Sequence, residues 1–228
     1  MQVLGVTESA VQHLRERIIT GELKPGQRLN EIELSEALGI SRPPLREALR
    51  TLARDYLVES IPRRGAFVTP LSLEGLNEIY SARSMVETHA VEIFGEKNIR
   101  DFSLLMASVE ESRDLQPPPP EDANGWLLYW KAFSDFHYRL VELAQNTFLL
   151  RFYKVIGYNL ARYQVLYLRL AGSNSESVHG HLEVVDLLEN GDYDLAKTML
   201  KTHVERTHEI LNESIKNQSE LLNHAQPA

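Results

Sequence analysis

Residues 30–52 constrain the fold of this chain more than any other segment, because they hold two short helices separated by one tight turn. Asn30 and Glu33 have the spacing of a capping box, which opens the first helix, and Gly39 is placed to end it. Ser41 then caps a second helix, whose first turn contains two prolines in positions where a missing N–H is tolerated. The segment therefore predicts a helix-turn-helix rather than one continuous helix.

A helix precedes this segment and a β-hairpin follows it. Apolar residues recur at helical spacing before residues 21–26, where two glycines and a proline end the pattern. Two short β-like runs cover residues 57–61 and 66–69, and the basic sequence 62–65 supplies the turn between them. The predicted unit, residues 1–70, is a winged helix-turn-helix with a small β-hairpin.

The rest of the chain, residues 71–228, has a helical pattern throughout. Ser72 is placed to cap the first helix, and the run Pro117–Pro120 requires a loop, because proline cannot continue a helix. No apolar stretch approaches the roughly 18–20 residues that span a bilayer, so no membrane partner is expected. The mostly α fold ends in an all-α antiparallel bundle, with helices expected at about 72–94, 99–114, 121–144, 147–170, 177–189 and 193–215.

Charge is divided unevenly between these two parts. The chain carries a net charge of −8, yet residues 1–70 sum to +1 and residues 71–228 sum to −9. A small, weakly basic module on an acidic body indicates two different tasks in one chain. The chain has no cysteine, which excludes disulfides, thiol nucleophiles and thiolate metal sites. Since no secretory signal is recognised, a cytoplasmic protein is expected.

The second helix of the helix-turn-helix carries side chains suited to reading DNA. One α-helix fits the major groove, and its first turn approaches base edges and phosphates. Arg42 and Arg46 lie one turn apart on a common face, and arginine can bind guanine or phosphate through two hydrogen bonds. Arg63 and Arg64 lie at the predicted wing tip, within reach of a minor groove. A solvated basic face is the alternative, but the capped spacing and the basic wing together favour DNA binding.

The pattern of this segment runs through Gly21-x-Leu23-x-Pro25-Gly26, Leu38-Gly39-Ile40-Ser41-Arg42-x-Pro44-Leu45-Arg46-Glu47-Ala48-Leu49 and the hairpin Arg64-Gly65-Ala66-Phe67-Val68. It resembles the DNA-binding signature of GntR-family bacterial transcription regulators. The resemblance implies a regulator, more commonly a repressor, that binds a palindromic double-stranded DNA operator as a homodimer. Pro43 stands where related proteins often have a hydroxyl residue, which changes one contact. The DNA contacts implied are Ser41, Arg42, Pro43, Pro44, Arg46, Arg64 and Gly65.

Three stretches of the helical part carry a second resemblance: Glu78-Ile79-Tyr80-x-x-Arg83-x-x-Val86-Glu87, Phe136-His137-x-x-Leu140-x-x-x-Ala144-x-Asn146, and residues 181–203 from His181 to His203. They are similar to the FCD effector domain of FadR-type members of the same family. The resemblance implies that residues 71–228 form the dimer and bind a small carboxylate or acyl effector.

Three histidines lie on apolar helix faces of this part. His137 shares a face with Leu140, while His181 and His203 lie on successive helices that a short turn makes antiparallel neighbours. Three imidazoles with an open position suit zinc, nickel or a similar divalent cation. The FCD resemblance implies an aspartate as a further ligand, but Phe133 stands at that position. Two interpretations stay open: a three-histidine site completed by water or an effector carboxylate, and the metal-free cavity of a fatty-acyl-responsive regulator.

Two arginines are candidates for binding the effector. Arg83 lies on a buried helix face, where either Glu87 or an effector carboxylate would supply the anion that its charge requires. Arg162, on a later helix, is the weaker candidate. A metal-dependent hydrolase with a DNA-binding appendage is the alternative from another class, with Asp135 or Glu183 as its base. We expect a regulator and no enzyme, because apart from these two residues no general base accompanies the histidines.

Overall fold

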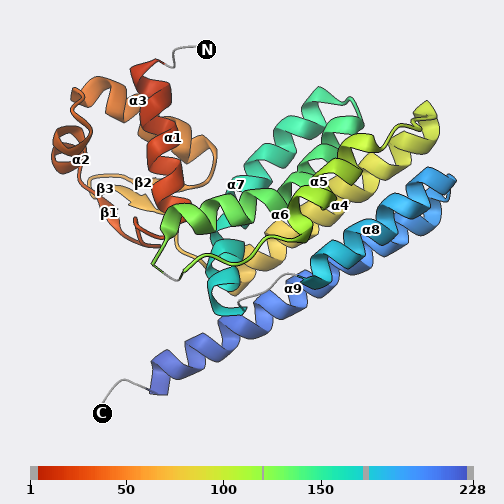
Figure 1. The fold of residues 1–228 in the computed structure, drawn as a ribbon. Helices are drawn as coiled ribbons and strands as arrows, with labels where there is room; N and C mark the ends of the chain where they lie inside the picture. Colours follow the sequence, from red (N-terminus) through yellow and green to blue (C-terminus); the bar gives the residue numbers. More distant parts are fainter. Residues whose placement is uncertain (1–4, 120, 172–174, 225–228) are drawn as a thin grey trace. The chain divides into compact units, whose positions relative to one another are not determined.

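The computed structural model describes residues 5–119, 121–171 and 175–224, and its elements are drawn in Figure 1. The chain separates into two compact units, Met1–Leu71 and Ser72–Ala228. Across the described ranges, helices dominate both units, and the sheet of the first unit has three short strands. The mostly α fold predicted from the sequence is confirmed.

The first unit combines helices with a small antiparallel sheet. Strand β3 lies between β1 and β2, and the β2–β3 pair is the predicted hairpin. Strand β1 pairs Arg28 with Phe67 and escapes sequence analysis, because two residues show no alternation. The elements are α1 (Val6–Ile19), β1 (Arg28–Leu29), α2 (Glu31–Leu38), α3 (Arg42–Arg54), β2 (Val58–Ile61) and β3 (Gly65–Val68).

Local signals produce the turn between α2 and α3. The Asn30 side chain accepts a hydrogen bond from the backbone N–H of Ile32 at 3.0 Å and donates one to Glu33 at 2.7 Å. Gly39 ends α2 with φ 64°, the left-handed conformation that favours glycine. Ser41 precedes α3 as expected, but its hydroxyl makes no capping hydrogen bond, so that part of the prediction is wrong.

One face of α3 is buried. Leu45 and Leu52 of α3 pack into a fully buried core that also holds Leu14 of α1 and Val68 of β3. Each such side chain contributes about 1.5–3 kcal/mol by leaving water, which fixes the orientation of α3 in this unit. The opposite face of α3, which carries its arginines, is exposed to solvent.

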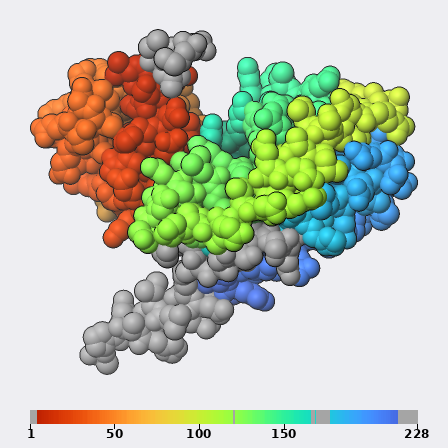
Figure 2. Space-filling view, in the orientation of Figure 1, coloured from red at the N-terminus to blue at the C-terminus, as the bar shows by residue number. Residues whose placement is uncertain are grey.

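The second unit is a helical bundle. Helix α4 packs against α6, α7 and α9, and α5 packs against α6 and α8. Prolines 117–119 lie in the α5–α6 loop, which runs over the surface of the bundle (Figures 1 and 2). Among the described helices, none is long and apolar enough to cross a membrane. The helices are α4 (Leu73–Lys97), α5 (Ser103–Arg113), α6 (Ala123–Leu143), α7 (Thr147–Ala171), α8 (Ser175–Asn190) and α9 (Tyr193–His224).

Two predicted helix boundaries are wrong. Helix α5 begins at Ser103 rather than near residue 99, because Asn98 ends α4 in the left-handed conformation and the chain needs a short connection after it. Helix α9 continues to His224, beyond the predicted end near residue 215. Its polar end has no glycine or proline to stop it, so the apolar pattern fades before the helix does.

Ser72 joins the start of the bundle to α7. Its hydroxyl accepts a hydrogen bond from the backbone N–H of Gly75 at 3.0 Å, so the predicted cap of α4 is confirmed. The Tyr163 hydroxyl, on α7, accepts from the N–H of Ser72 at 3.2 Å and donates to its carbonyl at 3.0 Å. The first residue of the bundle is therefore held by a helix far along the chain.

The centre of the bundle contains polar groups. Large apolar side chains such as Phe94 fill most of the core, but Arg83, Glu87, His137 and His181 are also buried. Buried charged and imidazole groups require hydrogen-bond partners, because leaving them unpaired is costly. Their partners define the candidate site.

Candidate functional site

The candidate DNA-binding residues lie at the first turn of α3 and at the β2–β3 turn. All are exposed except Pro44, which is half-buried. The structure brings the α3 group together on one end of a solvent-facing helix, which a DNA groove could admit. These residues are Ser41 immediately before α3, Arg42, Pro43, Pro44 and Arg46 in its first turns, and Arg64 and Gly65 at the β2–β3 turn.

Arg46 is held by an acidic neighbour that the sequence did not reveal. Its Nε lies 2.8 Å from Oε2 of Glu31, the first residue of α2. The two residues are 15 positions apart, so no helical spacing signals the pair. An exposed ion pair contributes only about 0–1 kcal/mol, and Arg46 can exchange Glu31 for a phosphate or a base at small cost.

The β2–β3 turn gathers basic groups. Arg63 and Gly65 have positive φ angles of 64° and 102°, which produce the sharp turn. The Arg64 guanidinium lies 5.8 Å from the centre of the Phe67 ring, a cation–π contact. A Cβ built on Gly65 would lie 3.8 Å from Nε of Arg28, so Arg28 of β1 adds a basic side chain that sequence analysis missed.

In the second unit, the three predicted histidines converge. His137 comes from α6, His181 from α8 and His203 from α9, and one nitrogen from each lies within 4.8 Å of the others. The Nε2 atoms of His137 and His181 are 3.0 Å apart. The His203 ring is stacked on that of His137, with centroids 5.4 Å apart.

Glu87 organises this cluster. Its carboxylate lies 2.9 Å from Nδ1 of His137 and accepts hydrogen bonds from Arg83 Nε at 2.8 Å and the Tyr153 hydroxyl at 2.7 Å. Burial alone would raise the pKa of Glu87, but Arg83 and His137 hold the pKa well below its usual range. The ionised carboxylate keeps the His137 proton on Nδ1, so Nε2 of His137 presents a lone pair.

Only part of this arrangement is visible in the sequence. Glu87 and an effector carboxylate were the two anions expected for Arg83, and the structure contains the ion pair with Glu87. The contacts of Glu87 with His137 and Tyr153, which are 50 and 66 residues away, were not predicted. No sequence spacing could have revealed these contacts, because they depend on how three helices pack.

The histidines are neutral at pH 7. Burial lowers the pKa of His137, and the charge of Arg83 lowers it further. Burial and neighbouring histidines bring the pKa of His181 well below its usual value and that of His203 to about 3. Neutral imidazole is the form that binds metal ions.

A cavity of about 340 Å³ adjoins the cluster and is lined by all three histidines and Arg83. Within the described residues, Arg83 Nη1 and His181 Nδ1 are buried without a hydrogen-bond partner. Arg162, the second predicted effector-binding residue, is buried and has its pKa lowered to about 10 by burial. It does not line this cavity, so only Arg83 of the two arginines lies beside the histidines.

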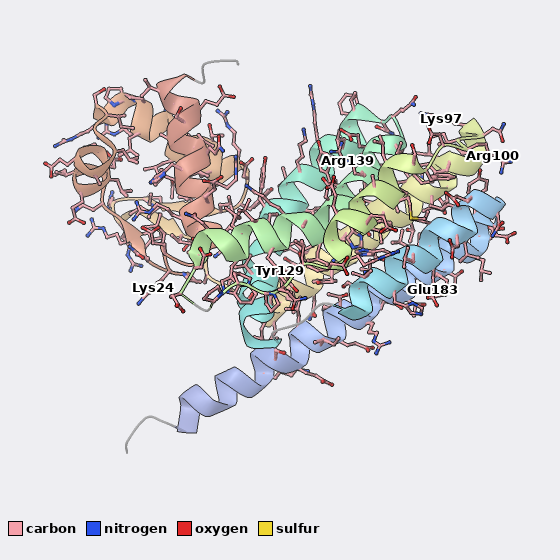
Figure 3. All side chains as sticks on the ribbon, in the orientation of Figure 1. Lys24, Lys97, Arg100, Tyr129, Arg139 and Glu183 are labelled. Atoms are coloured by element: carbon pink, nitrogen blue, oxygen red, sulfur yellow. The ribbon has the colours of Figure 1, made fainter. Side chains whose placement is uncertain are left out.

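An apolar side chain, that of Phe133, stands in place of the carboxylate that the FCD resemblance implies. Phe133 is buried, lines the cavity and stacks edgewise on Tyr129, which Figure 3 labels. Asp135 instead lies 3.2 Å from Arg139. Glu183 lies 3.3 Å from the exposed His179, and neither carboxylate lines the cavity. The hydrolase alternative therefore lacks its base at the histidines.

The donor set fits a divalent cation. Three neutral imidazoles supply ligand nitrogens. Small shifts of the side chains would allow all three nitrogens to lie roughly 2.0–2.1 Å from one zinc ion. The carboxylate of Glu87 behind His137 is the arrangement that orients metal-binding histidines elsewhere. His137, His181 and His203 would hold zinc or nickel, and the ion would attract an anionic ligand.

A helix-turn-helix with a basic wing, together with a helical bundle whose cavity is lined by Arg83 and three histidines, defines a DNA-binding transcription regulator. The model of the "Bacterial regulatory proteins, gntR family" matches residues 6–68, and that of the "FCD domain" matches residues 78–206. The chain belongs to the GntR family and carries an FCD domain. The relatives found are transcription regulators rather than enzymes.

Three relatives illustrate the similarity. The HTH-type transcriptional regulator YdhC of Bacillus subtilis is 34% identical over 60% of this chain and 59% of its own length. The Nta operon transcriptional regulator of Aminobacter aminovorans is 28% identical over 87% of this chain and 90% of its own. The gluconate operon transcriptional repressor of B. subtilis is 33% identical over 60% of this chain, and the match spans only 54% of that protein.

A solved structure has the same fold. The "transcriptional regulator GntR" from Rhodococcus sp. RHA1 superposes with a TM-score of 0.74 at 24% identity, covering 90% of this chain and 96% of that one.

Proposed function

We propose that this chain controls transcription by binding a palindromic operator as a homodimer in the cytoplasm. Helix α3 of each subunit would enter a major groove, where Arg42 and Arg46 would bind bases or phosphates. Ser41, Pro43 and Pro44 would lie close to the DNA backbone. Arg64 and Gly65 would meet the adjacent minor groove. A two-fold dimer suits a palindrome, since one recognition helix alone reads too few bases.

We propose that the chain represses transcription. A relative with 33% identity is named as an operon repressor. Binding of an effector would then weaken operator affinity, which requires that the effector favour a conformation with lower affinity for DNA.

We further propose that the effector is a small carboxylate bound in the cavity of the bundle. The observation that carries this proposal is Arg83 Nη1, which is buried beside the three histidines without a partner among the described residues. Glu87 already neutralises most of the charge of Arg83, and an incoming carboxylate oxygen would satisfy the remaining N–H groups.

A divalent cation held by His137, His181 and His203 would add positive charge for the same carboxylate. The residues then have separate tasks: the histidines hold the cation, Glu87 orients His137, and Arg83 binds a carboxylate oxygen. Phe133 forms an apolar part of the cavity wall.

Metal analysis of the purified protein, combined with thermal unfolding, tests the metal part. Added zinc should raise the melting temperature, because it binds only the folded state, and EDTA should reverse the rise. His203→Ala should abolish the rise, while His89→Ala, at an exposed position on α4, should keep it. A protein without stoichiometric metal, whose melting temperature ignores both EDTA and zinc, would contradict the metal site.

The metal-free alternative rests on one contact. The 3.0 Å separation of the His137 and His181 Nε2 atoms also suits a hydrogen bond between two neutral imidazoles. In that case a carboxylate should still bind through Arg83 in the presence of EDTA, and calorimetry with acetate would detect it.

A further inference from the structure

Gly157 occupies an unusual position in α7. Glycine destabilises the interior of a helix relative to alanine, so its presence there needs a reason. Gly180 has one: a Cβ on it would lie only 2.7 Å from Nδ1 of His203. A Cβ on Gly157 would meet no described atom within 4 Å, although Gly157 lines the cavity. The missing side chain leaves space that nothing in the described protein fills.

The cavity that Gly157 lines also has aromatic and aliphatic walls. Trp130 and Phe133 come from α6, while Tyr158, Leu160 and Leu168 come from α7. A flat ring packs well against other rings and against bare helix backbone, because both surfaces allow close approach. The cavity volume of about 340 Å³ lies within the roughly 300–1,000 Å³ range of small-molecule sites, so the cavity admits a ligand that contains a ring.

Several polar side chains of the lining are already engaged by the protein. Gln164 accepts a hydrogen bond from Trp130, and Tyr153 donates to Glu87. The Ser134 hydroxyl donates to the carbonyl of Lys131. Thr207 likewise donates to a backbone carbonyl, that of His203. These bonds take up hydroxyl protons and the Gln164 carbonyl, which leaves fewer free groups for a ligand with many hydroxyls. Arg83 and Lys154 both line the cavity, and their positive charge suits an anionic group.

We propose that the effector is an aromatic monocarboxylate, with its ring against Gly157 and its carboxylate at Arg83 and the histidines. This inference rests on the proposed function, because it assumes that an acid binds in this cavity. It adds the chemical class of the ligand body and names Gly157 as the residue that admits it.

Calorimetry on the full chain tests the proposal with phenylacetate, octanoate, gluconate and acetate as probes. Phenylacetate should bind the wild-type protein more tightly than the other three acids. Gly157→Leu should weaken phenylacetate binding by about ten-fold or more, since a few added methyl groups in an apolar pocket have effects of that size. Binding of acetate and of zinc should not change, because Gly157 contacts neither the arginine nor a histidine in the described structure.

Gly157→Ala serves as the graded control, with a smaller loss of phenylacetate binding and no loss of thermal stability. Tighter binding of gluconate or octanoate than of phenylacetate would overturn the proposed class of ligand. Equal phenylacetate affinity in wild type and a folded Gly157→Leu would overturn the role of Gly157. If none of the four acids binds the wild-type protein, the proposed carboxylate effector itself fails. The first two results would leave a carboxylate effector standing.

Discussion

Replacing Glu87 by glutamine removes the charge that balances Arg83 at the centre of the bundle. The side chains of Arg83 and Glu87 are 2% and 0% exposed, so this ion pair is fully buried. Removing one partner of such a pair typically costs about 3–5 kcal/mol, because the other charge stays buried without compensation. A domain of this size loses about 2–4 °C of melting temperature per kcal/mol, so we expect a fall of about 6–20 °C.

The same substitution should disturb metal binding. If the glutamine NH2 group faces His137, it cannot accept the Nδ1 proton, and the imidazole then carries its proton on Nε2 toward His181. A protonated Nε2 cannot bind a cation, so zinc affinity should fall about 10–100-fold, as when other carboxylates behind metal-binding histidines are lost.

Thermal unfolding in EDTA and zinc calorimetry measure the two effects separately. Glu92→Gln is the matched control, since Glu92 lies on the same helix but is 45% exposed where it pairs with Lys197. That control should change stability by no more than about 1 kcal/mol. If Glu87→Gln and Glu92→Gln lower the melting temperature equally, the buried network does not stabilise the bundle as argued.

Three further predictions concern DNA, assembly and pH. Arg46→Ala should cost about 1–3 kcal/mol of binding free energy on an operator selected from random DNA if Arg46 reads a base. Arg64→Ala should instead weaken the affinity for all DNA sequences evenly and lower its salt dependence, which titrations at several salt concentrations would measure. Sedimentation without DNA should show a dimer of two 26.0 kDa chains, and only monomer at micromolar concentration would count against it. Because the folded-state pKa of His203 is depressed to about 3, the metal-free protein should lose stability as pH falls from about 6.5 toward 3, by up to about 1.4 kcal/mol per pH unit for this group. Urea unfolding in EDTA should show this loss reduced in His203→Gln but not in His89→Gln.

The helix-turn-helix was predictable because its signals are local. Asn30, Gly39 and the prolines of α3 each act within one helical turn of their own position. The ion pair of Glu31 with Arg46 was not predictable, because it depends on the angle at which α2 meets α3. Strand β1 was missed for a similar reason, since its pairing partner lies far along the chain.

The three histidines of the candidate effector site could be predicted from the sequence, but the hydrogen bonds that Glu87 makes around them could not. Apolar neighbours place His137, His181 and His203 on inward helix faces, and antiparallel packing of those helices brings them together. The link from Glu87 to Tyr153 crosses between α4 and α7, two helices that sequence periodicity cannot align. In the sequence, nothing distinguishes Tyr153 from the other aromatic residues of α7.

The hydroxyl of Tyr163 connects Ser72, the first residue of the bundle, to α7, a helix that lines the cavity. It holds both backbone groups of Ser72, the residue that directly follows the end of the first unit at Leu71. Helix α7 carries Tyr163 on the same rigid rod as Gly157 and Leu160, which line the cavity less than two turns earlier. A ligand that displaces α7 would therefore displace Ser72 as well. This displacement would act on the backbone between Leu71 and Ser72, where the chain passes from one unit to the other.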